Sequence, residues 1–221
     1  SGNTTNTVRA TRWNGSSWTT NTISIGATGD DATYVDCDSN PLSTSNEIAC
    51  GSIGGSTLTA QSWAISAGTL TGTAGLNKDT SAGGNLASGN MPVAVTYVMD
   101  GSTTRAVFAW ADAVSTPSDN QIDYSIWNGS TWAANATFSK TFGDDQDLIA
   151  VRNPVDTTEA VFVIADENSD LWAARISLSG TTVTWSNADG GSALETSLAN
   201  ITGCAFDFAY NRSLSSPAYD Q

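Results

Sequence analysis

The sequence predicts an all-β fold built from repeated units, and three observations support this. A Trp-Asn-Gly motif over residues 11–18 returns over residues 125–132, with a second Trp closing each copy. Stretches of alternating apolar and polar residues lie between clusters of Gly, Asn, Asp and Pro, as strands lie between turns. The composition is rich in Ser, Thr, Asn, Gly and Ala and poor in Leu, which is typical of β-rich secreted and surface proteins.

Each copy of the motif predicts a β-hairpin. Asn-Gly is the commonest two-residue hairpin turn, because both central positions need a positive φ and these residues tolerate it. The flanking Trp residues can pack across the two strands and anchor the turn. We therefore expect Asn14-Gly15 and Asn128-Gly129, which are 128 − 14 = 114 residues apart, to occupy equivalent turns with positive φ.

The other elements follow in order. Residues 7–13 alternate, with Val8 and Ala10 on one side, and a second strand begins at Trp18. Further strands are expected where apolar residues alternate or run together between turn residues, at 32–37, 47–51, 57–66, 69–72, 93–97, 104–112, 121–127, 158–166, 171–177, 181–185 and 206–210. Residues 76–89 carry Gly and Ser throughout and predict a loop.

The spacing of the turns indicates the architecture. Gly15, Gly68, Gly129 and Gly180 are separated by 68 − 15 = 53, 129 − 68 = 61 and 180 − 129 = 51 residues. The apolar run at 104–112 returns at 158–166, and such continuous runs suit strands buried on both faces. Four short strands per ~50–60 residues are typical of propeller blades. The sequence therefore predicts a β-propeller of about four four-stranded blades, with a β-sandwich as the alternative.

These repeats predict one propeller-type domain over residues 1–221, with repeat hairpins near 7–28, 57–75, 121–142 and 171–188. The chain opens on what would be the third and fourth strands of a blade and closes on a first strand. Either the termini complete a four-bladed ring, or this chain is a piece of a longer array, with the rest of that larger chain among its partners.

The charge limits the partners. The chain has 8 Lys and Arg against 22 Asp and Glu, no His, and a net charge of −14. Such a charge repels phosphate backbones and anionic lipids, so it disfavours nucleic-acid and membrane-surface binding. No apolar run approaches ~18 residues, so direct membrane insertion by a helix is not expected. The lack of His removes the commonest general base and zinc ligand.

Three Cys residues are present. Cys37 and Cys50 flank a turn-rich segment, and a hairpin folding at Ser43-Thr44 places them opposite each other, within range of a disulfide. Cys204 then lacks a partner in the chain, which suggests a buried free thiol or a bond to something outside it.

Six glycosylation sequons occur, at Asn3, Asn14, Asn128, Asn135, Asn200 and Asn211. Their use requires a host that glycosylates.

Two segments carry oxygen ligands at alternate positions, as calcium loops do: Asp36, Asp38 and Asn40, and Asp166, Asn168 and Asp170. Neither has the later Gly and Glu of an EF-hand, so plain turns are the alternative. No other cofactor is expected. The acidic residues Asp30, Asp31, Asp144, Asp145 and Asp147 recur at strand entrances, which favours a structural role over acid–base catalysis.

The two Trp-Asn-Gly turns resemble degenerate Asp-boxes of the sialidase type, with Trp13 and Trp127 standing where the box has Asp. That resemblance implies a turn between the third and fourth strands of a propeller blade. Sialidases also use an arginine cluster, a Tyr nucleophile with its Glu, and an acidic residue. Arg residues here are scattered singly, so none of these roles can be carried over. More loosely, the chain resembles the blades of propeller lectins, in which aromatic residues stack on sugars.

The sequence thus predicts an extracellular or cell-surface module for binding or assembly, such as an adhesin, appendage or surface-layer component, and not an enzyme. Its partners would be surface glycans or other surface and filament proteins. The alternatives are a lectin-like glycan binder and a glycosidase-like propeller fragment with its active site elsewhere. The candidate contacts with a glycan or partner are Trp13, Trp18, Trp127 and Trp132, although core packing is the favoured reading of all four.

Overall fold

The computed structural model describes residues 8–18, 23–25, 32–54, 57–66, 69–72, 76–79, 91–112, 121–138, 140, 142, 147–166, 169–187, 192–197 and 206–210. All regular structure in these ranges is β, in fifteen strands. Among the residues so described, there is no helix long and apolar enough to cross a membrane. The predicted all-β fold is confirmed.

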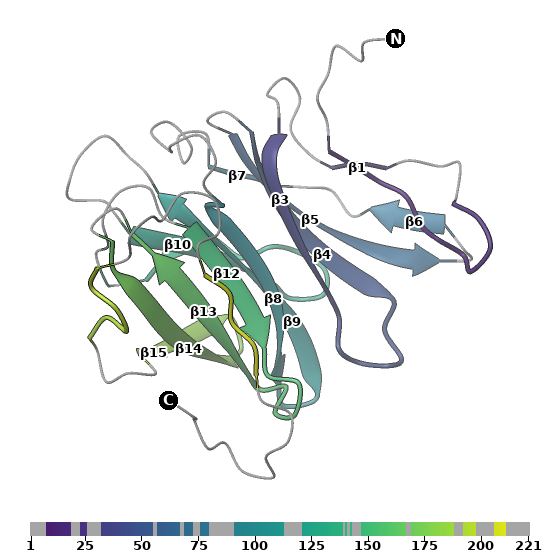
Figure 1. The fold of residues 1–221 in the computed structure, drawn as a ribbon. Helices are drawn as coiled ribbons and strands as arrows, with labels where there is room; N and C mark the ends of the chain where they lie inside the picture. The colour runs from purple at the N-terminus through teal and green to yellow at the C-terminus, as the bar shows by residue number, and fades with distance from the viewer. Residues whose placement is uncertain are drawn as a thin grey trace.

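The strands form four antiparallel sheets that follow one another in chain order (Figure 1). The first sheet pairs β1 (Val8–Ala10) with β2 (Ile23–Ile25). The second has the order β3 (Ala32–Ser39), β4 (Glu47–Gly54), β5 (Thr57–Ser66) and β6 (Thr69–Gly72), with β7 (Leu76–Asp79) also paired to β5. The third has β8 (Val93–Asp100), β9 (Thr103–Asp112), β10 (Gln121–Trp127) and β11 (Ala136–Thr137). The fourth has β12 (Asp147–Arg152), β13 (Glu159–Ala165), β14 (Leu171–Ser179) and β15 (Thr182–Asn187).

The sheets meet through their first strands. Val95 on β8 donates its backbone N–H to Asp36 on β3, and Leu148 on β12 donates to the carbonyl of Met91, just before β8. β8 therefore lies between β3 and β12, and the second, third and fourth sheets stack in succession. This is the order expected of blades, while closure of a ring stays a prediction.

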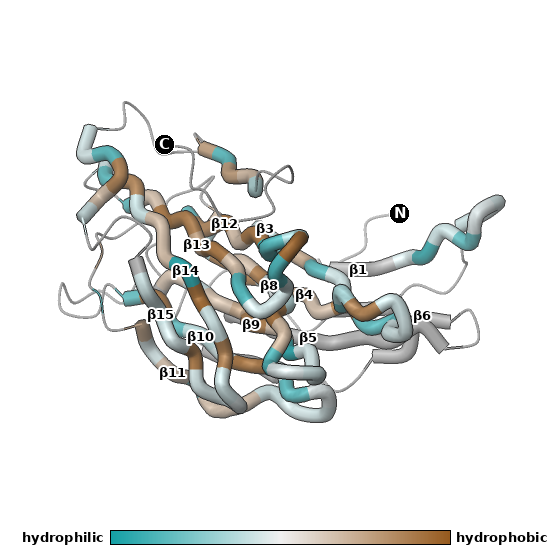
Figure 2. Tube along the Cα trace, turned by 90° about the horizontal axis from the view of Figure 1, so that it is seen from below, coloured by the Kyte–Doolittle hydropathy of each residue, from teal (hydrophilic) through white to brown (hydrophobic). Residues whose placement is uncertain are grey.

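Two strands are buried on both faces, as their apolar runs predict. On β9, Phe108 faces the second sheet while Val107 and Ala109 face the fourth. On β13, Phe162 faces the third sheet and Val161 lies on the opposite face. Figure 2 shows hydrophobic residues along β9 and β13. A sheet covered on both sides has no face left for water, which explains the continuous runs.

Two expectations are wrong. Residues 76–79, expected in a loop, form β7, because the short run Leu76–Asp79 adds to the edge of β5. Residues 206–210, expected as a strand, have no ladder to any described residue. The alternation there serves packing instead: Phe206, Phe208 and Tyr210 cover Val161 and Val163 of the fourth sheet.

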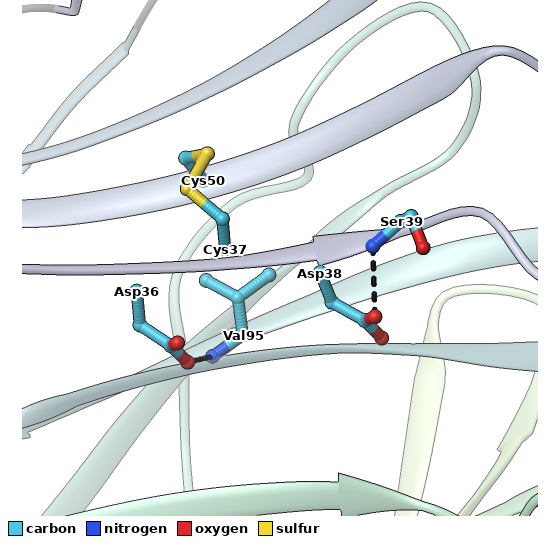
Figure 3. The surroundings of a disulfide bond; sticks show 6 residues. All are labelled: Asp36, Cys37, Asp38, Ser39, Cys50 and Val95. Atoms are coloured by element: carbon cyan, nitrogen blue, oxygen red, sulfur yellow. Dashed lines mark hydrogen bonds between the residues drawn. A yellow bond between two sulfur atoms is a disulfide. The ribbon is translucent and has the colours of Figure 1, made fainter. Parts of the chain in front are cut away.

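The disulfide forms as predicted between Cys37 and Cys50. The two residues are directly opposed in the register of β3 and β4, whose hairpin is centred between residues 43 and 44. Cys37 and Cys50 project to one side of β3, while Asp36 and Asp38 project to the other (Figure 3). Cys204 and the acidic residues Asp30, Asp31, Asp144 and Asp145 lie outside the described residues.

Gly51 on β4 allows the second and third sheets to approach. A Cβ added to Gly51 would overlap the ring of Phe108 on β9. Phe108 is fully buried and its ring also contacts Trp110 and Trp132, at centroid distances of 5.2 and 6.2 Å. These contacts leave no room for the Phe108 ring to shift, so position 51 requires glycine, which has no Cβ.

We expect Gly51→Ala to lower the free energy of unfolding by about 1–3 kcal/mol, the usual range for overpacking a tight core. The measurement is urea denaturation followed by circular dichroism. Gly129→Ala is the matched control, since nothing lies within 4 Å of its Cβ and only its φ of 96° opposes the change. Adding Phe108→Leu to Gly51→Ala should restore part of the loss. Equal losses at both glycines without such rescue would contradict the packing argument.

Candidate functional site

The two Trp-Asn-Gly turns have the same structure. In each, the Asn N–H donates to the carbonyl three residues on, Asn14 to Ser17 and Asn128 to Thr131, both at 3.1 Å. The Asn side-chain oxygen accepts two backbone N–H groups: from Ser16 and Ser17 in the first copy, both at 2.9 Å, and from Ser130 and Thr131 in the second, at 2.9 and 3.0 Å.

The expected two-residue turn is wrong in detail. Trp13 pairs with Trp18, and Trp127 with Trp132, so each loop has four residues. Gly15 and Gly129 have φ of 101° and 96°, whereas neither Asn has a positive φ. The Asn side chain closes the turn by accepting the loop N–H groups, which removes the need for Asn itself to enter the left-handed region.

The paired Trp rings also match. The centroids of Trp13 and Trp18 lie 5.5 Å apart at 58°, and those of Trp127 and Trp132 lie 5.6 Å apart at 50°. Tilted rings at this distance attract each other across the strand pair. Sequence equivalence therefore extends to side-chain geometry.

The surroundings of the two pairs differ. Trp127 and Trp132 are 1% and 6% exposed, whereas Trp13 and Trp18 are 50% and 63% exposed. The candidate contacts Trp127 and Trp132 are thus inter-sheet core residues, as the packing reading expected. Trp13 and Trp18 are the only exposed aromatic side chains among those that the structure describes.

The second pair is buried by the second sheet. Glu47, at the start of β4, accepts the indole N–H of Trp127 and the hydroxyl of Tyr97, each at 2.9 Å. Ala49 and Ile53 on the same face of β4 pack in the same cluster as Trp127 and Trp132. The sequence reading missed Glu47. A signal was present, since a Glu follows each Asn-Pro turn at the start of the next strand, Glu47 and Glu159.

Two of the predicted calcium ligands hold β8 instead. Asp36 accepts the N–H of Val95 at 2.7 Å, and Asp38 accepts that of Tyr97 at 2.8 Å (Figure 3 shows the first). Burial raises the pKa of Asp36 to about 6; the N–H bonds from Val95 and Cys37 oppose the rise, and the charge of Asp38 adds to it. Because Asp36 and Asp38 are two residues apart on one strand, they match alternate N–H groups along the edge of β8.

The remaining predicted ligands also have internal partners. Asn40 donates to the hydroxyl of Thr104 at 2.6 Å, and Arg152 donates to Asp38 at 3.0 Å. Asp166 accepts the backbone N–H of Asp170 and the indole N–H of Trp172, while Asn168 lies outside the described residues. Within the described ranges, no group of three His, Cys, Asp or Glu side chains is placed to hold a metal ion. Calcium binding stays a prediction.

Asp147 has the structural role expected of the recurring acidic residues, since it is buried and accepts the backbone N–H of Met91.

Of the sequons, Asn14 and Asn135 are exposed and Asn128 is half-buried. The amide nitrogens of Asn14 and Asn128 donate to Ser17 and Thr131 inside their turns. Asn3, Asn200 and Asn211, like the side chain of Trp63, lie outside the described part of the chain.

The fold is similar to that of a lectin. The structure of SapL1 lectin in complex with alpha methyl fucoside matches with a TM-score of 0.50 and 16% identity, covering 85% of this chain and 57% of that one. The BP39L lectin of Burkholderia pseudomallei matches at a TM-score of 0.28 and 15% identity, covering 77% of this chain and 59% of that one. The chain thus spans less than two thirds of either lectin. No family model and no curated protein matches, so the sialidase resemblance rests on the two turns alone.

Titration of Asp36 should make stability depend on pH. Its folded pKa of about 6 lies above the ordinary 3.8, so the folded state keeps a proton that the unfolded chain releases. The retained proton contributes to the free energy of unfolding in full below about pH 4, and this contribution is lost as the pH rises through about 6. Asp36→Asn keeps an acceptor for Val95 without the charge. Between pH 4 and pH 8, we expect the free energy of unfolding of this variant to rise by up to about 3 kcal/mol relative to that of the wild type.

The measurement is urea denaturation of both proteins across that pH range. Asp207→Asn makes the same change in net charge at an exposed position and is the control. A difference between Asp36→Asn and the wild type that does not vary with pH would contradict the prediction.

Proposed function

We propose that this chain is an extracellular, non-catalytic carbohydrate-binding module of the lectin type. The observation that carries the proposal is the exposed Trp13–Trp18 pair, presented by a rigid turn on a fold similar to that of a lectin. Large exposed aromatic groups are costly in water and mark binding surfaces. Trp has a flat apolar face and one N–H donor, a combination that suits the apolar face and hydroxyl groups of a sugar.

The geometry of the pair supports this use. The rings of Trp13 and Trp18 are tilted by 58°, so they offer two apolar surfaces at an angle, and the hydrogen bonds of Asn14 fix the loop between them. A fixed aromatic platform loses little conformational entropy on binding. The disulfide between Cys37 and Cys50 is consistent with an oxidising, extracellular location. Attachment to a cell surface, and use of the exposed sequons, belong to the same proposal.

Glycan-array screening of the whole chain tests the proposal, and titration calorimetry with the best ligand then measures its affinity. An aromatic contact contributes about 1 kcal/mol or more. We therefore expect Trp13→Ala and Trp18→Ala each to weaken binding about fivefold to tenfold. Val155→Ala changes an exposed apolar residue elsewhere and should leave binding unchanged.

Three results would count against the proposal in different ways. Binding to no glycan would remove the carbohydrate assignment. Full binding by both Trp variants would place the site elsewhere. Turnover of aryl glycosides that is lost on Asp144→Asn, Asp145→Asn and Asp147→Asn would favour the glycosidase alternative.

A further inference from the structure

The chain contains a second, buried copy of the candidate sugar site, and a carboxylate is bound to it. The turn that carries Trp127 and Trp132 has the hydrogen bonds and ring geometry of the turn that carries Trp13 and Trp18. In the buried copy, the carboxylate of Glu47 on β4 accepts the indole N–H of Trp127 at 2.9 Å. This contact indicates which chemical group a Trp pair of this geometry can bind.

The two Trp residues of the buried copy make different contacts. Trp127 donates to a charged acceptor, which makes a stronger hydrogen bond than a neutral one. Trp132 contributes its ring, which lies 6.2 Å from the ring of Phe108 between centroids. The group that suits such a pair therefore presents a carboxylate beside an apolar surface.

The same donor is available in the exposed copy. Trp13 pairs with Trp18 as Trp127 pairs with Trp132, so Trp13 stands in the position of the donor. The indole N–H of Trp13 donates to no residue that the structure describes, and the side chain is half exposed. A ligand from solvent can reach this group.

The charge around the exposed pair favours an anion, although the whole chain is acidic. Residues 1–29 contain Arg9 and Arg12 and no Asp or Glu, and Arg12 directly precedes Trp13. Residues 30–221 then hold 8 − 2 = 6 Lys and Arg against all 22 Asp and Glu. Salt screens charges that lie beyond ~8–10 Å, so the local charge matters more to a ligand than the net charge does.

The fold keeps this basic segment apart from most of the acidic side chains. Figures 1 and 2 show β1 and β6 at the end of the molecule away from the fourth sheet. The strands β1, β2, β5 and β6 carry no Asp or Glu. An anionic ligand on the Trp13–Trp18 turn would therefore meet the least acidic end of the chain.

We propose that the ligand of the Trp13–Trp18 site is a glycan that contains a uronic acid. Trp13 donates its indole N–H to the sugar carboxylate, as Trp127 does to Glu47, and the ring of Trp18 covers the apolar face of the sugar. This inference rests on the proposed carbohydrate-binding function and adds the class of sugar to it.

Pairs of sugars that differ only in the carboxylate test the inference. The probes are tetrasaccharides of galacturonic, mannuronic and glucuronic acid, each compared by titration calorimetry with its carboxyl-reduced, neutral form. We expect at least one uronate to bind the whole chain about tenfold more tightly than its reduced form, because a hydrogen bond to a charged group is lost on reduction. This advantage should shrink as the salt concentration rises.

Two matched variants assign the effect to the donor. Trp13→Phe keeps an aromatic ring but removes the N–H, so its uronate affinity should fall to that for the reduced sugar. Trp18→Phe should change both affinities alike and keep their ratio. Equal binding of uronate and reduced sugar by the wild type, or a ratio that Trp13→Phe leaves unchanged, would overturn the inference while carbohydrate binding stands.

Two further outcomes would overturn it for other reasons. Binding to no glycan on the array would remove the proposed function, and the class of sugar with it. A polyglutamate peptide that binds as tightly as the best uronate, and loses this affinity in Trp13→Phe, would assign the site to an acidic protein partner.

Discussion

The stacking of the sheets depends on how the edge of β8 is satisfied. β8 begins the third sheet, so one of its edges carries N–H groups that no strand of its own sheet pairs with. Asp36 and Asp38 of β3 accept the N–H groups of Val95 and Tyr97. Carboxylates thus complete the edge without joining two sheets into one. An unpaired edge invites association with other chains, and acidic groups bound along it block that route.

Similar bonds tie the third sheet to the fourth. Asp147 accepts the N–H of Met91, and Asp100 accepts that of Gly180 at 2.8 Å. Arg152 on β12 reaches β3, where it donates to Asp38 and to the carbonyl of Ser39. The inner strands of three sheets are therefore joined by side-chain to backbone bonds, while the faces behind them join by apolar packing. A displacement of one sheet breaks both kinds of contact together.

The repeat was readable from the sequence because its turns carry rare residues. Trp-Asn-Gly, the Asn-Pro turns and the apolar runs at β9 and β13 gave the strands, the antiparallel units and the opposed Cys37 and Cys50. What failed was local: β7 formed on an available edge of β5, and residues 206–210 found a packing surface but no ladder. Pairing and packing with distant segments decide such cases, and alternation alone cannot distinguish them.

The sequence predicted which residues form the candidate site, but it did not predict which of them are exposed. The four Trp residues of the two turns are equivalent in sequence, and they are equivalent in local geometry. Trp127 is a core residue because the neighbouring second sheet covers it, whereas Trp13 is exposed to solvent. That neighbour is far away in sequence, since Glu47 and Trp127 are 80 residues apart. A sequence motif therefore fixes the turn, whereas the fold decides what the turn does.

The acidic composition has a similar double meaning. A net charge of −14 suggests a property of the surface that selects neutral or basic partners. Yet six of the acidic side chains accept internal hydrogen bonds that join strands or sheets: Asp36, Asp38, Glu47, Asp100, Asp147 and Asp166. A carboxylate can accept two N–H groups at once and makes stronger bonds than a neutral acceptor. Part of the negative charge therefore stabilises the fold, because these carboxylates accept the hydrogen bonds that join sheets with few Lys and Arg residues. Those side chains have a structural role whether or not the surface binds a partner.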